Sequence, residues 1–368
     1  MKVKKRYVIP VILVLVSALL VLIARNNRNF SDFYAENIFP YISTPFVFLS
    51  GLFPFSLGEV FVLFAIILVG LGIPAMIILV IFGKSFRKKT LSVSLTTVLW
   101  CLAYVCVTET LNCFIMYGCT TFSEKYFESK QHPKDELVQL YSMLIDKTNE
   151  LALEVPRDEE NRFVLTVDPQ EEAKKAMKKA SEKYPQLSGY YPKAKPIMFS
   201  YFMSQSNLLG MYFPFSMEST YNDDMVETNL PQVLCHEFSH LKGFIQEDEA
   251  NFVSFVATCG SDNIEVQYSG YLDALEYVHN QIYKNGITSG YELTYSISDE
   301  VKNDWFRFMP DNYWEENKEK EVISTETVST VSTTATDTSL KMNGVSDGIE
   351  SYSRMVNLLL DYYFPPEK

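Results

Sequence analysis

Three long apolar stretches in the first third of the chain constrain its fold more than any other feature of the sequence. Residues 7–24 and 60–82 contain no Asp, Glu, Lys or Arg, and residues 91–118 contain only Glu109. Because about 20 apolar residues cross a bilayer as a helix, we predict three transmembrane helices at these positions. The first stretch could instead be a cleaved signal peptide, but the sequence RNNRNFSDF that follows it has no small-x-small cleavage site. We therefore expect a retained anchor.

Basic residues in the short loops predict how these helices are oriented. The first residues, MKVKKR, and the loop GKSFRKK at residues 83–89 are both basic, whereas the loop between the first two stretches carries acidic residues as well. Lys and Arg are enriched in cytoplasmic loops, so we place the N-terminus and residues 83–89 in the cytoplasm. With three crossings of the cell membrane, everything after Gly118 is then expected outside the cytoplasm.

The remaining residues, 119–368, are expected to form an acidic folded domain. The chain has a formal net charge of −13, and nearly all of its acidic residues follow residue 118. This excess of negative charge argues against nucleic acid as a partner. We predict a membrane domain over residues 1–118, followed by an extracytoplasmic α+β domain that is mainly helical with a small sheet. The lipid bilayer is therefore one expected partner.

Hydrophobic periodicity predicts most of the secondary structure of this second domain. Asp168 is expected to cap the start of one helix, and Gly243 to end another. Residues 195–216 predict two short strands around a turn at Gly210. The Ser/Thr-rich residues 324–339 lack a core-forming pattern and predict a mobile loop or a surface strand. Helices are predicted over residues 134–154, 168–187, 230–242, 246–258, 270–284, 299–318 and 351–364.

The sequence HEFSH at residues 236–240 carries the chemistry that most distinguishes this chain. His236 and His240 lie one helical turn apart on one face, so both imidazoles can reach the same metal ion. Glu237 stands beside the first ligand, where its carboxylate can take a proton from a water that zinc has acidified to a pKa of about 7. The alternative is two buried core histidines with Glu237 on a solvated edge. We prefer the zinc site, because an ionised Glu in an apolar helix is costly without a partner.

The acidic residues that follow offer a third ligand. In the sequence EDEAN, Glu247 and Asn251 share a helix face, which favours Glu247 as the ligand and Asn251 as a support for the free N–H of a ligating histidine. Glu249 is the fallback ligand. Asp248 is expected to cap the helix or to face solvent.

Other titratable side chains receive secondary roles. His132 lies in the hydrophilic segment ESKQHPKDE and is expected to be exposed. An enzyme with this centre needs a group that stabilises an oxyanion, and Tyr352, Tyr271 and His279 are candidates that the sequence does not rank.

Six cysteines allow two disulfides outside the cell. Sequence spacing cannot decide whether they form, and we prefer buried free thiols. The two possible pairs are Cys113 with Cys119 and Cys235 with Cys259.

The order H-E-x-x-H followed by E-x-x-A-[DN] resembles the gluzincin-type zinc metallopeptidases. The chain as a whole is more similar to an uncharacterised bacterial membrane family, the domain-of-unknown-function family numbered thirty-eight ten. This second resemblance rests on the three N-terminal spans and on runs at residues 212–215, 236–252 and 343–363. Together they imply a zincin-like metallopeptidase domain with zinc as its cofactor. Asn251 departs from the gluzincin pattern, in which aspartate stands at this position.

The resemblance also implies a role for the segment NLLGMYFPFSME at residues 207–218. In such a fold an edge strand pairs with the backbone of a peptide substrate, and Gly210 would allow close approach; a plain core strand fits the sequence equally well. The sequence therefore leaves two possible functions. One is a membrane-anchored zinc metalloendopeptidase, a hydrolase; the other is a catalytically silent zinc-binding sensor or scaffold. The intact Glu237 favours the first. A transporter is excluded, because Glu109 is the single ionisable residue inside the spans.

Overall fold

The three apolar stretches form long helices. The computed structural model describes residues 5–83, 85–346 and 354–366, and three of its helices are long and apolar enough to span a membrane. They cover Lys5–Asn26, Leu57–Phe82 and Arg87–Gly118, so each predicted stretch lies within one of them. Few of their side chains are buried inside the protein. Such a continuous apolar surface is compatible with a membrane protein.

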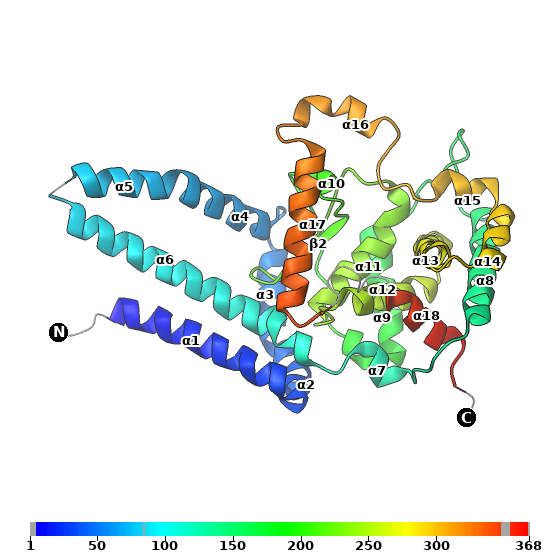
Figure 1. The fold of residues 1–368 in the computed structure, drawn as a ribbon, viewed down its shortest axis with the longest axis horizontal. Coiled ribbons are helices and arrows are strands. Elements are labelled where there is room, and N and C mark those ends of the chain that lie inside the picture. Colours follow the sequence, from blue (N-terminus) through cyan, green and yellow to red (C-terminus); the bar gives the residue numbers. More distant parts are fainter. Residues whose placement is uncertain (1–4, 84, 347–353, 367–368) are drawn as a thin grey trace. The chain divides into compact units, whose positions relative to one another are not determined.

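In the first part of the chain, all the regular secondary structure that is described is helical. Its elements are α1 (Lys5–Asn26), α2 (Arg28–Asn37), α3 (Phe39–Gly51), α4 (Leu57–Ile67), η1 (Leu68–Gly72), α5 (Ile73–Phe82), α6 (Arg87–Glu109), η2 (Thr110–Phe114) and η3 (Met116–Gly118). The segments η1 and η2 are π-helical, and they interrupt the second and third long helices. α1 and α5 both pack along α6 (Figure 1).

The chain divides into two compact units. The first, here called the membrane unit, consists of residues 1–119 together with residues 213–218. The second unit consists of residues 120–212 and 219–368. The chain thus leaves the second unit for a short segment and then returns to it, which no sequence pattern indicates.

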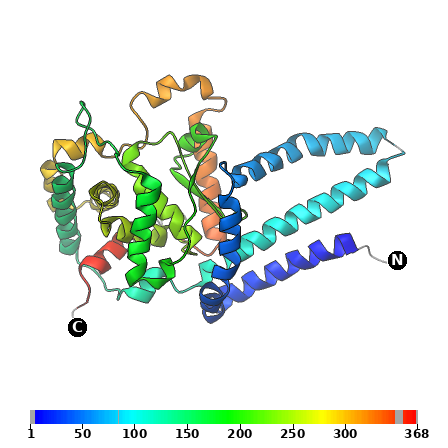
Figure 2. The same cartoon turned by 180° about the vertical axis from the view of Figure 1, so that it is seen from behind.

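The second unit is also mainly helical, and its core is formed by helices that the sequence predicts. Its helices are α7 (Phe122–Tyr126), α8 (Lys134–Ala152), α9 (Pro169–Lys183), α10 (Ser200–Gln205), α11 (Leu230–Leu241), α12 (Glu247–Cys259), α13 (Ile264–Lys284), α14 (Thr288–Leu293), α15 (Asp299–Asp304), α16 (Tyr313–Glu316), α17 (Thr325–Met342) and α18 (Met355–Tyr363), with short 3₁₀ turns between some of them. α11, α12 and α13 pack against one another, and α8 covers α13. α9 packs on α11 and α12, and Figure 2, which shows the molecule from behind, gives the view from its side. Asp168 caps α9 as predicted, accepting hydrogen bonds from two N–H groups of its first turn.

A small sheet completes this architecture. It contains β1 (Lys195–Pro196), β2 (Gly210–Phe213) and β3 (Glu218–Tyr221) in the order β1-β3-β2. β1 runs parallel to β3, with Lys195 opposite Thr220. β2 and β3 are consecutive and joined by residues 214–217, so they form a hairpin. β2 therefore lies at an edge of the sheet.

The prediction for residues 195–216 was wrong in its details. Between the strands the chain forms α10, whose Ser204 hydroxyl donates to the carbonyl of Ser200 one turn earlier. Gly210 opens β2 and does not form the turn. Short segments rich in serine and aromatic residues fit helix and strand alike, and tertiary packing decides between them.

The prediction for residues 324–339 was also wrong, because this Ser/Thr-rich segment is the helix α17. Ser324 caps its start by accepting from the N–H of Thr327, and the hydroxyls of Thr334 and Thr338 donate to carbonyls one turn earlier. Local side-chain bonds of this kind make threonine compatible with a helix despite its low propensity. The single helix predicted over residues 299–318 is broken into α15 and α16, and Phe306 between them has a positive φ of 50°.

The side chain of His132 is buried, which contradicts the prediction that it is exposed. Only 5% of its side chain is exposed. Its Nδ1 lies 2.6 Å from a carboxylate oxygen of Glu136 at the start of α8, and its Nε2 lies 2.7 Å from Asp361 in α18. Glu136 from the hydrophilic segment around His132 and the distant Asp361 thus satisfy both ring nitrogens of the buried side chain. The two ends of the second unit are thereby joined.

None of the six cysteines is part of a disulfide in this structure. Cys235 is fully buried in α11, with its sulfur 3.8 Å from the carbonyl oxygen of Ala173. The preferred interpretation of buried free thiols therefore describes Cys235, and neither possible disulfide is formed.

Candidate metal centre

The centre is built by two consecutive helices and the sharp turn between them. The apolar side chains of Leu234, Phe238 and Leu241 bury one side of α11, which leaves the histidines on another side. The helix ends at Leu241, Lys242 is its C-cap, and Gly243 follows with a positive φ of 91°, as expected of a glycine that ends a helix. The chain reverses there, so the first turn of α12 returns toward the histidines and carries Glu247 with it.

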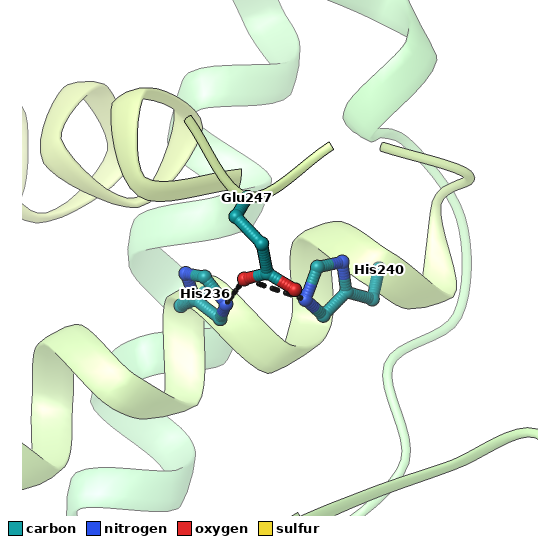
Figure 3. Close-up of side chains that lie close together, drawn as sticks. All are labelled: His236, His240 and Glu247. Carbon is teal, nitrogen blue, oxygen red and sulfur yellow. Dashed lines mark ion pairs between the residues drawn. The ribbon is translucent and has the colours of Figure 1, made fainter. Parts of the chain in front are cut away.

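Three side chains converge at this point (Figure 3). Nε2 of His236 lies 3.2 Å from Oε2 of Glu247, and Nε2 of His240 lies 3.8 Å from the same oxygen. The three ligand atoms all lie within 4.8 Å of one another. Among the described residues this is the only group of three His, Cys, Asp or Glu side chains close enough to hold a metal ion.

The surroundings of the two histidines suit a metal of zinc's type. Nδ1 of His240 lies 2.7 Å from the carbonyl oxygen of Phe244, which can only accept, so Nδ1 carries the proton and Nε2 presents its lone pair. Asn251, which lies near enough to His236 to contribute to its raised pKa, donates its side-chain N–H to the hydroxyl of Tyr277 at 2.9 Å. Two imidazoles and one carboxylate, with one imidazole oriented by a backbone carbonyl, are a ligand set that zinc accepts.

The electrostatics of the centre favour a bound cation. Burial lowers the pKa of His236, but the hydrogen bond and charge of Glu247 outweigh it and raise that pKa to about 9. Burial lowers the pKa of His240 to about 4. Glu247 thus favours the protonated, cationic form of His236, whereas burial favours the neutral form of His240. A metal ion must displace the proton of His236 before all three groups can ligate it.

Glu237 lies beside these ligands but is not one of the three converging side chains. Only 3% of its surface is exposed, and its Oε2 atom is buried without a hydrogen-bond partner. Burial raises the pKa of this carboxyl to about 8. Gly210 of β2 lies directly against it, because a Cβ atom at that position would overlap the Glu237 carboxylate. Only glycine therefore allows the edge strand to lie this close to the carboxylate.

The other acidic residues of the EDEAN sequence lie away from the centre. Glu249, the fallback ligand, accepts hydrogen bonds from the backbone N–H of Ser123 at 2.9 Å and from its hydroxyl at 2.5 Å. Asp248 is buried and forms an ion pair with Arg354 at 2.9 Å, so the expectation that it caps the helix or faces solvent was wrong. The structure thus brings together His236, His240 and Glu247.

The candidates for the oxyanion-stabilising group are engaged elsewhere or not described. The ring of Tyr271 packs edge-on against Phe255. Nδ1 of His279 lies 2.8 Å from the hydroxyl of Tyr141. Tyr352 lies outside the described residues.

Several side chains near the centre are not indicated by the sequence alone. The centroid of the Tyr212 ring in β2 lies 5.8 Å from the centroid of the His240 ring. Gln232, one turn before His236 on the same face of α11, donates to Asp273 of α13 at 3.0 Å. The four-residue spacing between Gln232 and His236 could have indicated that Gln232 lies on the same helix face as the centre. The positions of Asp273 in α13 and Tyr212 in β2 could not have been predicted, because they depend on packing between distant segments.

Comparisons with known proteins place the chain in a family. No curated protein and no solved structure matches it. A family model described as "Protein of unknown function (DUF3810)" matches residues 34–360. The match includes the second and third long helices, the hairpin of β2 and β3, and the converging side chains of α11 and α12. Because it covers most of the sequence, the chain belongs to this family of proteins of unknown function.

Proposed function

We propose that this protein is a membrane-anchored, zinc-dependent metallopeptidase that hydrolyses peptide bonds. The observation that carries the proposal is the convergence of His236, His240 and Glu247 with the buried carboxylate of Glu237 beside them. A site for structural zinc usually has four protein ligands, whereas three ligands leave a position for water. A carboxylate with an unpartnered oxygen next to that position is suited to proton transfer.

Each side chain of the centre would have its own role in such a reaction. Zinc, when bound, supplies a Lewis acid that acidifies a water molecule and polarises the scissile carbonyl. Glu237 accepts the proton that the attacking water loses and passes it to the amine that leaves. Burial raises the pKa of Glu237 from its usual acidic value toward neutral pH, the range in which a proton-transfer group is most effective. The Phe244 carbonyl keeps the His240 imidazole in place, and the neighbouring Asn251 would support that of His236.

The strand β2 supports a peptide as the substrate. It is an edge strand and therefore has one side on which another extended chain can pair. Gly210 brings this strand against Glu237, and Tyr212 places its ring near that of His240. A substrate paired with β2 would have its backbone held alongside the catalytic carboxylate, as the resemblance to zinc peptidases implies.

The proposed activity has a direct test. Purified full-length protein in detergent should contain close to one zinc per chain and should cleave members of an unbiased peptide library. A zinc chelator should abolish cleavage, and added zinc should restore it. Protein that is folded and loaded with zinc but cleaves no peptide would favour the catalytically silent sensor or scaffold.

The orientation of the membrane helices is part of the proposal. The basic residues at the N-terminus and at 83–89 support a cytoplasmic position for both, which would leave the second unit outside the cytoplasm. An alkaline phosphatase fused after Gly118 should therefore be active, and one fused at Lys89 inactive. The opposite pattern would place the second unit in the cytoplasm and would contradict an extracytoplasmic peptidase.

A further inference from the structure

The turn of the β2–β3 hairpin belongs to the membrane unit, although both strands continue into the second unit. Glu218, at the start of β3, is 2% exposed. Its carboxylate accepts hydrogen bonds from the backbone N–H groups of Leu57 at 3.1 Å and Gly58 at 2.7 Å. These N–H groups begin α4 and have no partner within the helix, so a negative charge is stabilising there. Glu218 thus caps the second long helix.

The third long helix contacts the same turn. The hydroxyl of Tyr104 in α6 donates to the carbonyl of Phe215 at 2.6 Å. The side chain of Asn112, in the π-helical segment η2, donates to the carbonyl of Pro214 at 2.7 Å. π-Helical segments often occur where a side chain must be redirected for function, and here Asn112 is directed at the hairpin.

The fit between the turn and α4 is close. A Cβ atom at Gly58 would overlap the ring of Phe213. The next glycine of the same long helix, Gly70, has no atom within 4 Å of an added Cβ. Met217 in the turn holds a positive φ of 53°, which a non-glycine residue keeps only where its surroundings fix the backbone. The turn is therefore seated in a specific conformation.

The strands of this hairpin also contact the candidate catalytic helix within the second unit. Gly210 in β2 lies against the carboxylate of Glu237, and the hydroxyl of Ser219 in β3 donates to the Glu237 carbonyl at 3.0 Å. The Thr220 hydroxyl donates to the carbonyl of Met211 at 2.7 Å and ties the strands together. Gly210 and Phe213 are the two ends of a single short strand, so a shift at one end moves the other.

We infer that the membrane helices hold the hairpin in the position that seats its edge strand on Glu237. Gly58 and Glu218 are then positioning residues, which act on the reaction through β2 and touch neither metal nor substrate. The kinetic consequence rests on the proposed peptidase function, whereas the mechanical coupling does not. In this arrangement, disturbing α4 changes how β2 receives a peptide without changing the metal ligands.

The test compares two glycines of one helix in the full-length protein in lipid nanodiscs. Gly58→Ala introduces a methyl group into the Phe213 ring, and Gly70→Ala introduces the same group into open space. Hydrogen exchange of peptides covering residues 209–222 should accelerate about tenfold or more in Gly58→Ala and stay at the wild-type rate in Gly70→Ala. Glu218→Gln, which keeps the shape and removes the charge, should act in the same direction. Zinc content should equal that of wild type in all three variants.

Peptide cleavage by the same samples provides the second measurement. For Gly58→Ala we expect KM to rise about tenfold or more, because the strand that receives the peptide has moved. A purely structural defect would instead lower the active fraction at unchanged KM. Equal exchange in Gly58→Ala and Gly70→Ala would overturn the inference, and so would faster exchange with unchanged KM. If wild type cleaves no peptide, the peptidase proposal fails, and the exchange rates alone decide whether α4 holds the hairpin.

Discussion

Replacing Glu237 by glutamine should reduce peptide cleavage by a factor of about a hundred or more while leaving the fold and the bound zinc intact. Glutamine has the shape of glutamate but cannot take a proton from water. Glu237 is not among the three converging ligand atoms, so zinc content should stay close to one per chain. The measurement is cleavage of the best library peptide by wild type and variant at equal zinc content.

Glu249→Gln provides a matched control for this variant. Glu249 is also a buried glutamate whose pKa burial raises, but its carboxylate bonds Ser123 and not the metal centre. Its replacement should leave kcat near the wild-type value. If Glu237→Gln cleaves as fast as wild type, or fully restores a strain that lacks the gene, Glu237 is not a catalytic base and the peptidase proposal is wrong.

Loss of either histidine should abolish zinc binding. In His236→Ala or His240→Ala, two ligands remain of a set whose affinity depends on all three. Zinc per chain should fall from near one to near zero after dialysis against a weak chelator. Zinc at a thousand times its Kd stabilises a folded protein by about 4 kcal/mol, so both variants should also lose the rise in Tm that zinc gives wild type.

The carboxylate ligand can be identified in the same experiment. Glu247→Gln should weaken zinc binding by more than about a hundredfold, since even residues that only support a ligand contribute ten- to a hundredfold. Asn251→Ala belongs to that supporting class and should fall within the smaller range. Glu249→Gln should bind zinc as wild type does. A larger loss in Glu249→Gln than in Glu247→Gln would transfer the third-ligand role to Glu249.

The sequence predicted the parts of the centre that depend on local spacing. His236 and His240 share a face because they are one turn apart, and Gly243 ends the helix because it can adopt a positive φ. Glu247 follows within a few residues, so the turn at Gly243 suffices to bring it back. These relations need no knowledge of the rest of the fold.

The parts that were missed depend on contacts between distant segments. The sequence predicts that Asp248 caps the helix or faces solvent, because nothing in it shows that Arg354 lies beside this carboxylate. Gly210 was assigned to a turn because glycine is common there, whereas its small size is needed to accommodate Glu237. Neither relation leaves a periodic signal in the sequence, because each joins residues from different elements.

The bridge from His132 to Asp361 has a consequence for how the protein is made. It joins side chains 229 positions apart, and α18 also packs on α12, the helix that carries Glu247. A nascent chain therefore cannot close the second unit around the histidines before residue 361 has been synthesised. Closure over such a sequence distance is slow, and the incomplete chain exposes apolar surface meanwhile. Until synthesis reaches α18, the unfinished unit is thus a client for chaperones and a target for quality-control proteases.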